Sequence, residues 1–348
     1  MPTSLLFILS VLIWGSTFLV ITVQLGEVAP AVSVVYRFGL GCILLFAWCA
    51  LRKQQIWIEW QRQPLLMLQG VLNFGLAYVC TYIAEGYLVS ALVAVLFSLV
   101  IFWNAIGARL CFGTRITWQM VSATVLSMSG MVLLFSEPLA AAWHAITTGS
   151  TAGDKLLVGL AFALAATIFS SAGNMVSVKV GRMHQNNVCV TTAWAMLWGT
   201  LFVALLVAVT GQKWALPSTP AYWVAMLYLA LFGSVLAFSA YFVLINRIGP
   251  AKASMVGVLI PVVSVLLSMR FEHYQPGMSG FFGMVLCLAG VVLVIRGQSN
   301  HASGTIVSTE GVVPPLHRNW SIFALRTFPT SAGRKHAILV PRFFRTLG

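Results

Sequence analysis

The sequence predicts an all-α integral membrane protein in which ten transmembrane helices form two inverted five-helix repeats around a central cavity. Hydrophobic residues make up 59% of the 348 residues, and charged residues only 8%. Soluble domains carry about 25% charged residues, so this chain has too little polar surface to cover a water-facing globule. Its apolar runs are near or above the roughly 20 residues that cross a bilayer, and they lack the alternation of barrel strands.

Ten apolar runs define the expected spans. The first half contains Ser4–Gln24, Val28–Leu51, Pro64–Ile83, Leu88–Phe112 and Thr117–Phe135. The second half contains Lys155–Val178, Val188–Thr210, Pro220–Leu244, Ala253–Phe271 and Gly277–Ile295. The first run has the position of a signal peptide, but no Lys or Arg precedes it and a second run follows almost at once. We therefore expect it to be a retained helix.

The basic residues set the expected orientation. With the N-terminus inside, 16 of the 20 Lys and Arg residues fall in cytoplasmic segments and three fall outside. Cytoplasmic loops carry such an excess of positive charge, so we expect a multi-pass protein of the inner or plasma membrane with both termini in the cytoplasm. The basic residues stand singly at the ends of apolar runs, so the net charge of +13 indicates lipid headgroups rather than nucleic acid as the partner.

The two sets of five spans resemble each other. Ile13-Trp14-Gly15-Ser16 is similar to Ile168-Phe169-Ser170-Ser171, and Ser129–Leu133 is similar to Ala289–Leu293. Because each unit has an odd number of spans, the second must insert upside down, a construction that places the solute path between the halves. The expected boundaries are a first repeat at 1–137, an external linker at 138–154, a second repeat at 155–296 and a tail at 297–348.

The tail has six basic residues, one acid and no sustained periodicity. Its Ser, Thr, Gly and Pro residues interrupt any element, so we expect a disordered cytoplasmic segment. Contact of its Arg and Phe residues with the anionic inner leaflet is a weaker expectation, because the basic residues are spread out rather than clustered.

Short motifs in a fixed order make a family resemblance specific. They are Trp14-Gly15-Ser16-Thr17-Phe18, Pro30, Arg37-Phe38, Ser90–Phe97, Tyr228–Ser234, Ile248–Ala251 and Pro261. Over about residues 4–296 the chain resembles the drug/metabolite transporter superfamily, in its EamA-like branch of ten-span exporters. The resemblance implies a solute exporter whose third and sixth spans border the cavity. The chain departs from the family at Gly113-Thr114-Arg115, where Gly-Glu-Arg is common, and at Glu272, which comes slightly early.

Arg37 is a cation within an apolar span, about nine residues after its start, or roughly 13 Å deep at 1.5 Å per residue. An intramembrane charge is costly and by default functional. One interpretation is a group that meets an anionic moiety of the solute. The other is a structural partner for helix-end carbonyls or for Glu85, and the shared Arg-Phe pattern of the family favours such a common task.

Polar and aromatic side chains within the spans complete the set of cavity candidates. Asn73 and Asn174 need hydrogen-bond partners at membrane depth, although interhelical bonding alone would satisfy them. Aromatic residues would line a pocket for an apolar or zwitterionic solute, although Tyr and Trp are also common at membrane interfaces. The candidate substrate-binding residues are Trp14, Arg37, Asn73, Tyr78, Asn174, Trp194 and Tyr241. Pro261 is expected to kink the ninth span, as a rocking point or as a static bend.

The sequence lacks the patterns of an enzyme. It has no His-x-x-x-His pair, no Walker-type loop and no Cys-x-x-Cys pair among its six cysteines. We therefore expect no catalytic residue, cofactor or metal site, and no carboxylate within the membrane. The expected activity is export of a small-molecule solute, such as an amino acid or a related metabolite, across the lipid bilayer. An integral-membrane enzyme acting on lipid-borne substrates and a non-transporting scaffold or sensor are the alternatives, and a homodimer is compatible with the sequence.

Overall fold

A computed structural model of the chain describes residues 1–113, 118–134, 136, 140, 143–144, 147–148, 151–183, 187–253, 255–271, 275, 277–286, 289–290, 293, 323–328 and 336–341. It divides into two units, Met1–His301 and Ala302–Gly348, and each is described by itself.

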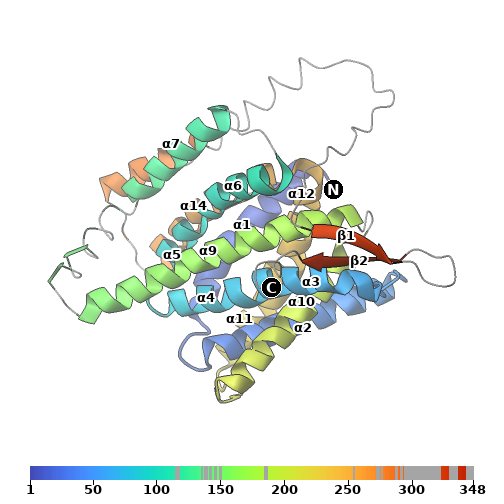
Figure 1. The fold of residues 1–348 in the computed structure, drawn as a ribbon. Coiled ribbons are helices and arrows are strands. Elements are labelled where there is room, and N and C mark those ends of the chain that lie inside the picture. Colours follow the sequence, from blue (N-terminus) through green and yellow to red (C-terminus); the bar gives the residue numbers. More distant parts are fainter. Residues whose placement is uncertain are drawn as a thin grey trace, which may run out of the picture. The chain divides into compact units, whose positions relative to one another are not determined.

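Helices and their connections make up the described part of the larger unit (Figure 1). The first half contains α1 (Thr3–Thr22), α2 (Pro30–Leu51), η1 (Trp60–Arg62), α3 (Gln63–Gly70), η2 (Val71–Leu76), α4 (Ala77–Glu85), α5 (Ser90–Phe97), α6 (Val100–Phe112) and α7 (Trp118–Leu134). The second half contains α9 (Thr151–Met183), α10 (Val188–Val209), α11 (Pro220–Tyr228), η3 (Leu229–Leu236), α12 (Ala237–Ile248), α13 (Pro250–Ala253) and α14 (Val256–Phe271). Residues 278–286 are also helical.

Seven helical stretches in the described residues are long and apolar enough to cross a membrane. They are Thr3–Thr22, Pro30–Leu51, Trp60–Glu85, Ser90–Phe112, Gly153–Gly181, Val188–Val209 and Pro220–Ile248. The expected fifth and ninth spans appear as α7, with 17 residues, and α14, with 16. The tenth expected run lies partly outside the described residues. The all-helical membrane class is confirmed, whereas the described helices do not establish the full count of ten.

Local sequence signals explain where several helices begin and end. α2 and α11 each begin with a proline, whose fixed φ suits the first helical turn. The side chain of Asn187 caps α10 by accepting a hydrogen bond from the backbone N–H of Val190. α6 ends at Phe112, and the next residue, Gly113, has a left-handed φ of 64° that a side chain would disfavour.

The helices expose apolar side chains on their outer faces. On α1, Leu5, Ile8 and Leu12 are more than two-fifths exposed, while Leu6 and Val11 are buried against the other helices. A helix that is apolar all round is typical of a membrane span, because lipid replaces water as its solvent.

The two halves pack against each other reciprocally. α2 runs alongside α10, the corresponding second helix of the other half (Figure 1). α1 packs against α12 and α14, whereas its counterpart α9 packs against α4 and α6. The first helix of each half therefore contacts the third and fourth spans of the other half, as inverted repeats require.

The third span of each half contains a π-helical segment in its middle. These segments are η2, between α3 and α4, and η3, between α11 and α12. Both contain a Phe-Gly pair, Phe74-Gly75 and Phe232-Gly233. π-Helical turns are rare and frequently lie at functional sites. The fourth span is interrupted too, because a turn at Ser98 and Leu99 separates α5 from α6. In the ninth span, Met255 is in a turn directly before α14.

Pro261 lies inside α14 and is buried. Its ring removes one backbone hydrogen bond of the helix. Met255, in a turn directly before α14 begins at Val256, comes earlier in the chain than Pro261. A kink at Pro261 stays a prediction.

One segment differs from the expectations. In the tail, Phe323–Phe328 (β1) pairs antiparallel with His336–Pro341 (β2), where we expected disorder. Both segments are mostly apolar six-residue runs, a length and composition that suit a strand.

Candidate functional site

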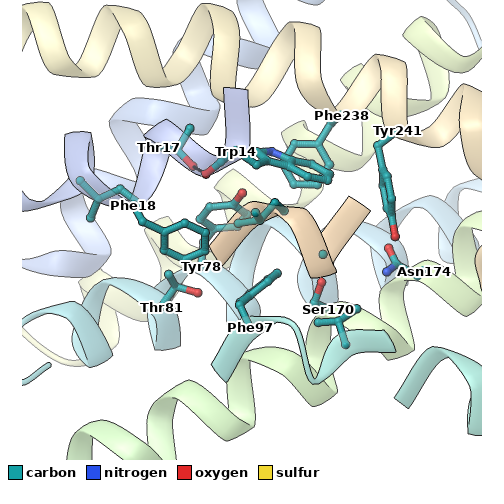
Figure 2. A pocket seen from close by; sticks show the side chains of 14 residues that line it. Trp14, Thr17, Phe18, Tyr78, Thr81, Phe97, Ser170, Asn174, Phe238 and Tyr241 are labelled. Carbon is teal, nitrogen blue, oxygen red and sulfur yellow. Dashed lines mark hydrogen bonds between the residues drawn. The ribbon is translucent and has the colours of Figure 1, made fainter. Parts of the chain in front are cut away.

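A cavity of about 650 Å³, including the space at its open end, lies between helices of both halves (Figure 2). Helices α1, α4, α5 and α6 of the first half and α9, α12 and α14 of the second contribute side chains to it. The lining residues are Trp14, Thr17, Phe18, Ile21, Tyr78, Thr81, Phe97, Val100, Ser170, Asn174, Phe238, Tyr241, Gly257 and Ile260.

Helical spacing places these residues on shared faces. Trp14, Thr17, Phe18 and Ile21 follow the i, i+3, i+4, i+7 pattern of one face of α1. Ser170 and Asn174 are one turn apart on α9, and Phe238 and Tyr241 are three residues apart on α12 in the same way. The cavity therefore arises where one stripe of each of several helices meets.

Aromatic rings form much of the wall. The ring of Trp14 lies edge-on to Tyr241, with centroids 4.8 Å apart, and to Phe238, with centroids 5.0 Å apart. Phe18 and Phe97 make a similar contact at 5.9 Å. Edge-on contacts at these separations are favourable for aromatic pairs. They hold the rings in place and leave an apolar surface toward the cavity.

A hydrogen bond to a backbone carbonyl of η3 fixes the Trp14 side chain. Its Nε1 donates to the carbonyl oxygen of Gly233 at 3.1 Å, so the indole of the first half is attached to the second. A Cβ at Gly233 would lie 2.8 Å from Cγ2 of Thr17, so the close approach of α1 to η3 requires glycine there.

The polar groups of the cavity are hydroxyls and one amide. Nδ2 of Asn174 donates to Oδ1 of the buried Asn104 in a long hydrogen bond of 3.5 Å. Figure 2 shows the hydroxyl end of Tyr241 directed toward Asn174. Thr17 and Thr81 donate their hydroxyls to carbonyls of their own helices. No Asp, Glu, Lys or Arg is among the lining residues in the described part of the chain, so the wall carries no formal charge.

Arg37 lies next to the cavity but not in its wall. The residue is fully buried, and its Nε donates to Oγ of Ser234 at 3.0 Å. Nη1 lies 3.5 Å from Oη of Tyr82, whose own proton goes to Gln24 at 2.8 Å. The guanidinium carbon is 4.6 Å from the centre of the Tyr78 ring. Arg37 therefore faces the cavity only through Tyr78, and its contacts join α2 to α4 and η3.

Of the seven predicted residues, the structure places four in the cavity wall: Trp14, Tyr78, Asn174 and Tyr241. Asn73 is buried in η2 against α9, where a Cβ at Gly173 would collide with its amide. Trp194 lies elsewhere on α10, and its Nε1 donates to the carbonyl oxygen of Ile56 at 2.9 Å. Binding roles for all seven stay predictions, but the geometry does not bring Arg37, Asn73 and Trp194 to the cavity.

Several residues of the cavity wall were not among those predicted from the sequence. Phe18 is one turn from Trp14 within the motif Trp14–Phe18, so helical spacing alone would have indicated it. Phe97 and Phe238 carry no such signal, because their orientation depends on the interruption after α5 and on the π-helical turn before α12.

Comparison with known proteins is consistent with this architecture. The chain is similar to the uncharacterized inner membrane transporter YedA of Escherichia coli K12, with 28% identity over 293 residues that cover 82% of this chain and 88% of that protein. Protein PecM of Dickeya dadantii is 27% identical over 81% of this chain and 88% of its own length. An uncharacterized transporter of Archaeoglobus fulgidus is 23% identical over 85% and 98%.

A solved crystal structure shows the same fold, with a TM-score of 0.67 over 86% of this chain and 98% of the other at 16% identity. The model of the EamA-like transporter family matches residues 1–136 and 157–296. These matches confirm the resemblance seen in the motifs and identify a membrane transporter. The chain belongs to the EamA-like transporter family, within the drug/metabolite transporter superfamily.

Proposed function

We propose that this membrane transporter exports a small neutral or zwitterionic solute, such as an amino acid or a related metabolite, by alternating access between its two halves. The observation that carries the proposal is the uncharged, aromatic-walled cavity to which both halves contribute helices. Solute sites of inverted-repeat transporters lie at such an interface between the repeats.

The chemistry of the wall supports a solute without net charge. Trp14, Phe97 and Phe238 offer apolar surface, and Asn174 and Ser170 offer hydrogen bonds. A charged group that enters this site without a partner pays a large desolvation cost. A zwitterion balances its own charges and can hydrogen-bond to the hydroxyls and the amide.

The orientation in the membrane and the boundaries of the two repeats are those predicted from the sequence. Both termini lie in the cytoplasm, and the moving units are the repeats at 1–137 and 155–296. The reciprocal packing of α1 and α9 supports a movement in which each half changes its contacts with the other.

A flux assay tests the proposal. Purified protein is reconstituted into liposomes, and transport of tritiated phenylalanine, threonine, lysine and glutamate is measured against protein-free liposomes. We expect saturable flux of at least one of the two neutral amino acids and background flux of lysine and glutamate. In cells loaded with the transported amino acid, expression is expected to speed its efflux. Background flux of all four would contradict the proposal.

A further inference from the structure

A second cavity of about 240 Å³, including the space at its open end, lies between four helices beyond the central one. Its walls come from α3, α9, α10 and α12, and the residues that matter here are Gln69, Ser177, Gly181, Thr191, Phe242 and Asn246. None of them belongs to the central cavity. This second cavity is mixed in character, with amides and hydroxyls next to the Phe242 ring.

The second cavity continues the same helix faces as the central one. On α9, Asn174 lines the central cavity, and Ser177 and Gly181 line the second, three and seven residues further on. At 1.5 Å per residue, Gly181 is about 10 Å beyond Asn174 along the helix. On α12, Phe238 lines the central cavity and Phe242, one turn later, lines the second. The two cavities therefore lie in series along α9 and α12.

One buried polar group in the second cavity lacks a protein partner. Gln69 is only 2% exposed, and its Oε1 accepts no hydrogen bond within the described part of the chain. A buried acceptor of this kind is unfavourable unless water or a ligand donates to it. Asn246 is exposed, so the second cavity begins at the protein surface and extends inward to Gln69.

Helices α9 and α12 approach each other closely at the outer end of the second cavity, because a Cβ at Gly181 would collide with the side-chain amide of Asn246. Lys179 and Arg247 lie at this end of the two helices. Basic residues near span ends indicate the cytoplasmic side.

We propose that the second cavity is the cytoplasmic vestibule of the solute path. A neutral solute with a hydrogen-bond donor binds Gln69 there, and separation of α9 from α12 admits it past Phe242 to the central cavity. This inference rests on the proposed transport function, and it adds a second binding position and the side from which the solute enters.

Thiol labelling tests the vestibule with a pair of neighbouring residues. In a full-length chain whose six cysteines are replaced by alanine, Thr191→Cys introduces a thiol into the cavity wall. Thr192→Cys is the neighbouring control, because Thr192 lies on the same helix outside the wall, although it is 1% exposed against 8% for Thr191. Met175→Cys on α9 is the control matched in burial to Ser177, because both residues are 6% exposed and Met175 lies outside the wall. The probe is the membrane-impermeant reagent 2-sulfonatoethyl methanethiosulfonate, applied to inside-out and right-side-out vesicles. Gel filtration checks folding, and Ser177→Cys repeats the test from α9.

We expect Thr191→Cys and Ser177→Cys to react at least tenfold faster than Thr192→Cys in inside-out vesicles, and slowly in right-side-out vesicles. Equal rates for Thr191→Cys and Thr192→Cys, or faster reaction from the outer face, would overturn the vestibule. Flux of the four amino acids through the unmodified chain is measured separately. Flux together with equal labelling rates contradicts the vestibule alone, whereas absence of flux contradicts the proposed function itself.

Discussion

Arg37 is a buried cation whose observed hydrogen bonds stay within the protein. It contacts Ser234, Tyr82 and the ring of Tyr78, and the last of these separates it from the cavity. Hydrogen bonds from a charged donor contribute about 1.5–3 kcal/mol, and a desolvated cation–π contact about 2 kcal/mol. These contacts favour the structural interpretation of Arg37. In this interpretation Arg37 affects the solute only indirectly, through its contact with Tyr78.

Arg37→Ala is therefore expected to lower the free energy of unfolding by about 3 kcal/mol, because its charged hydrogen bonds and its ring contact are lost together. Ser234→Ala removes only one partner and is expected to cost about 2 kcal/mol. Arg52→Ala is the control, because this exposed arginine directly after α2 has only a cation–π contact with Trp48 and should cost about 1 kcal/mol or less. Thermal unfolding in detergent measures all three. An Arg37→Ala variant with unchanged stability and no flux would instead indicate a direct role with the solute.

The π-helical segments are the elements that set the geometry of the cavity. η3 presents the Gly233 carbonyl to Trp14 and the Ser234 hydroxyl to Arg37. η2 places Asn73 against Gly173 of α9. The third span of each half thus contains a π-helical segment at an equivalent place. Each segment packs against the first helix of the other half.

Gly233→Ala is expected to destabilise the contact of α1 with η3. The new Cβ would lie 2.8 Å from Thr17 and 3.0 Å from Nη2 of Arg37, and such overpacking costs about 1–3 kcal/mol. Gly39→Ala is the matched control, because its nearest neighbour would be Cγ2 of Thr200 at an ordinary 3.6 Å. Comparison of the two melting temperatures checks the expectation. A Gly233→Ala protein as stable as Gly39→Ala would show that η3 can move away from α1 at no cost.

At the scale of the whole molecule, Glu27, between α1 and α2, joins the two halves. Its carboxylate accepts hydrogen bonds from the Thr219 hydroxyl and from the backbone N–H of Ser218 and Thr219, at the start of α11. The Thr219 hydroxyl, above all, holds the pKa of Glu27 below its ordinary value of 4.5. The ionised carboxylate is therefore the form that the folded protein binds more strongly.

Glu27 should consequently stabilise the protein only where it is ionised. Its folded-state pKa lies below the unfolded value, so its contribution is present above pH 4.5 and is lost as the pH falls through the folded-state pKa. Glu27→Gln is expected to melt at a lower temperature than the unmodified protein near neutral pH. The difference should disappear in acid, and melting curves across this range measure it. A difference that does not change with pH would contradict this account.

The sequence predicted the spans well because apolar length and prolines at helix starts are local signals. α2 and α11 begin within two residues of the expected Val28 and Pro220. The rotation of each helix about its axis is not local, which is why Trp14 and Tyr78 line the cavity while Arg37 and Trp194 do not. The π-helical turns also escaped prediction, because their sequences are as apolar as the α-helices beside them.

The central claim is that solute binds against Trp14 in the uncharged cavity between the halves. Its most direct test compares Trp14→Ala with Trp118→Ala, which truncates an exposed tryptophan on α7 outside the cavity. Flux of the transported amino acid into liposomes is measured at equal amounts of folded protein. We expect Trp14→Ala to lower flux at least tenfold and Trp118→Ala to retain it, with Trp14→Phe between them. Equal flux through Trp14→Ala and Trp118→Ala would contradict the account.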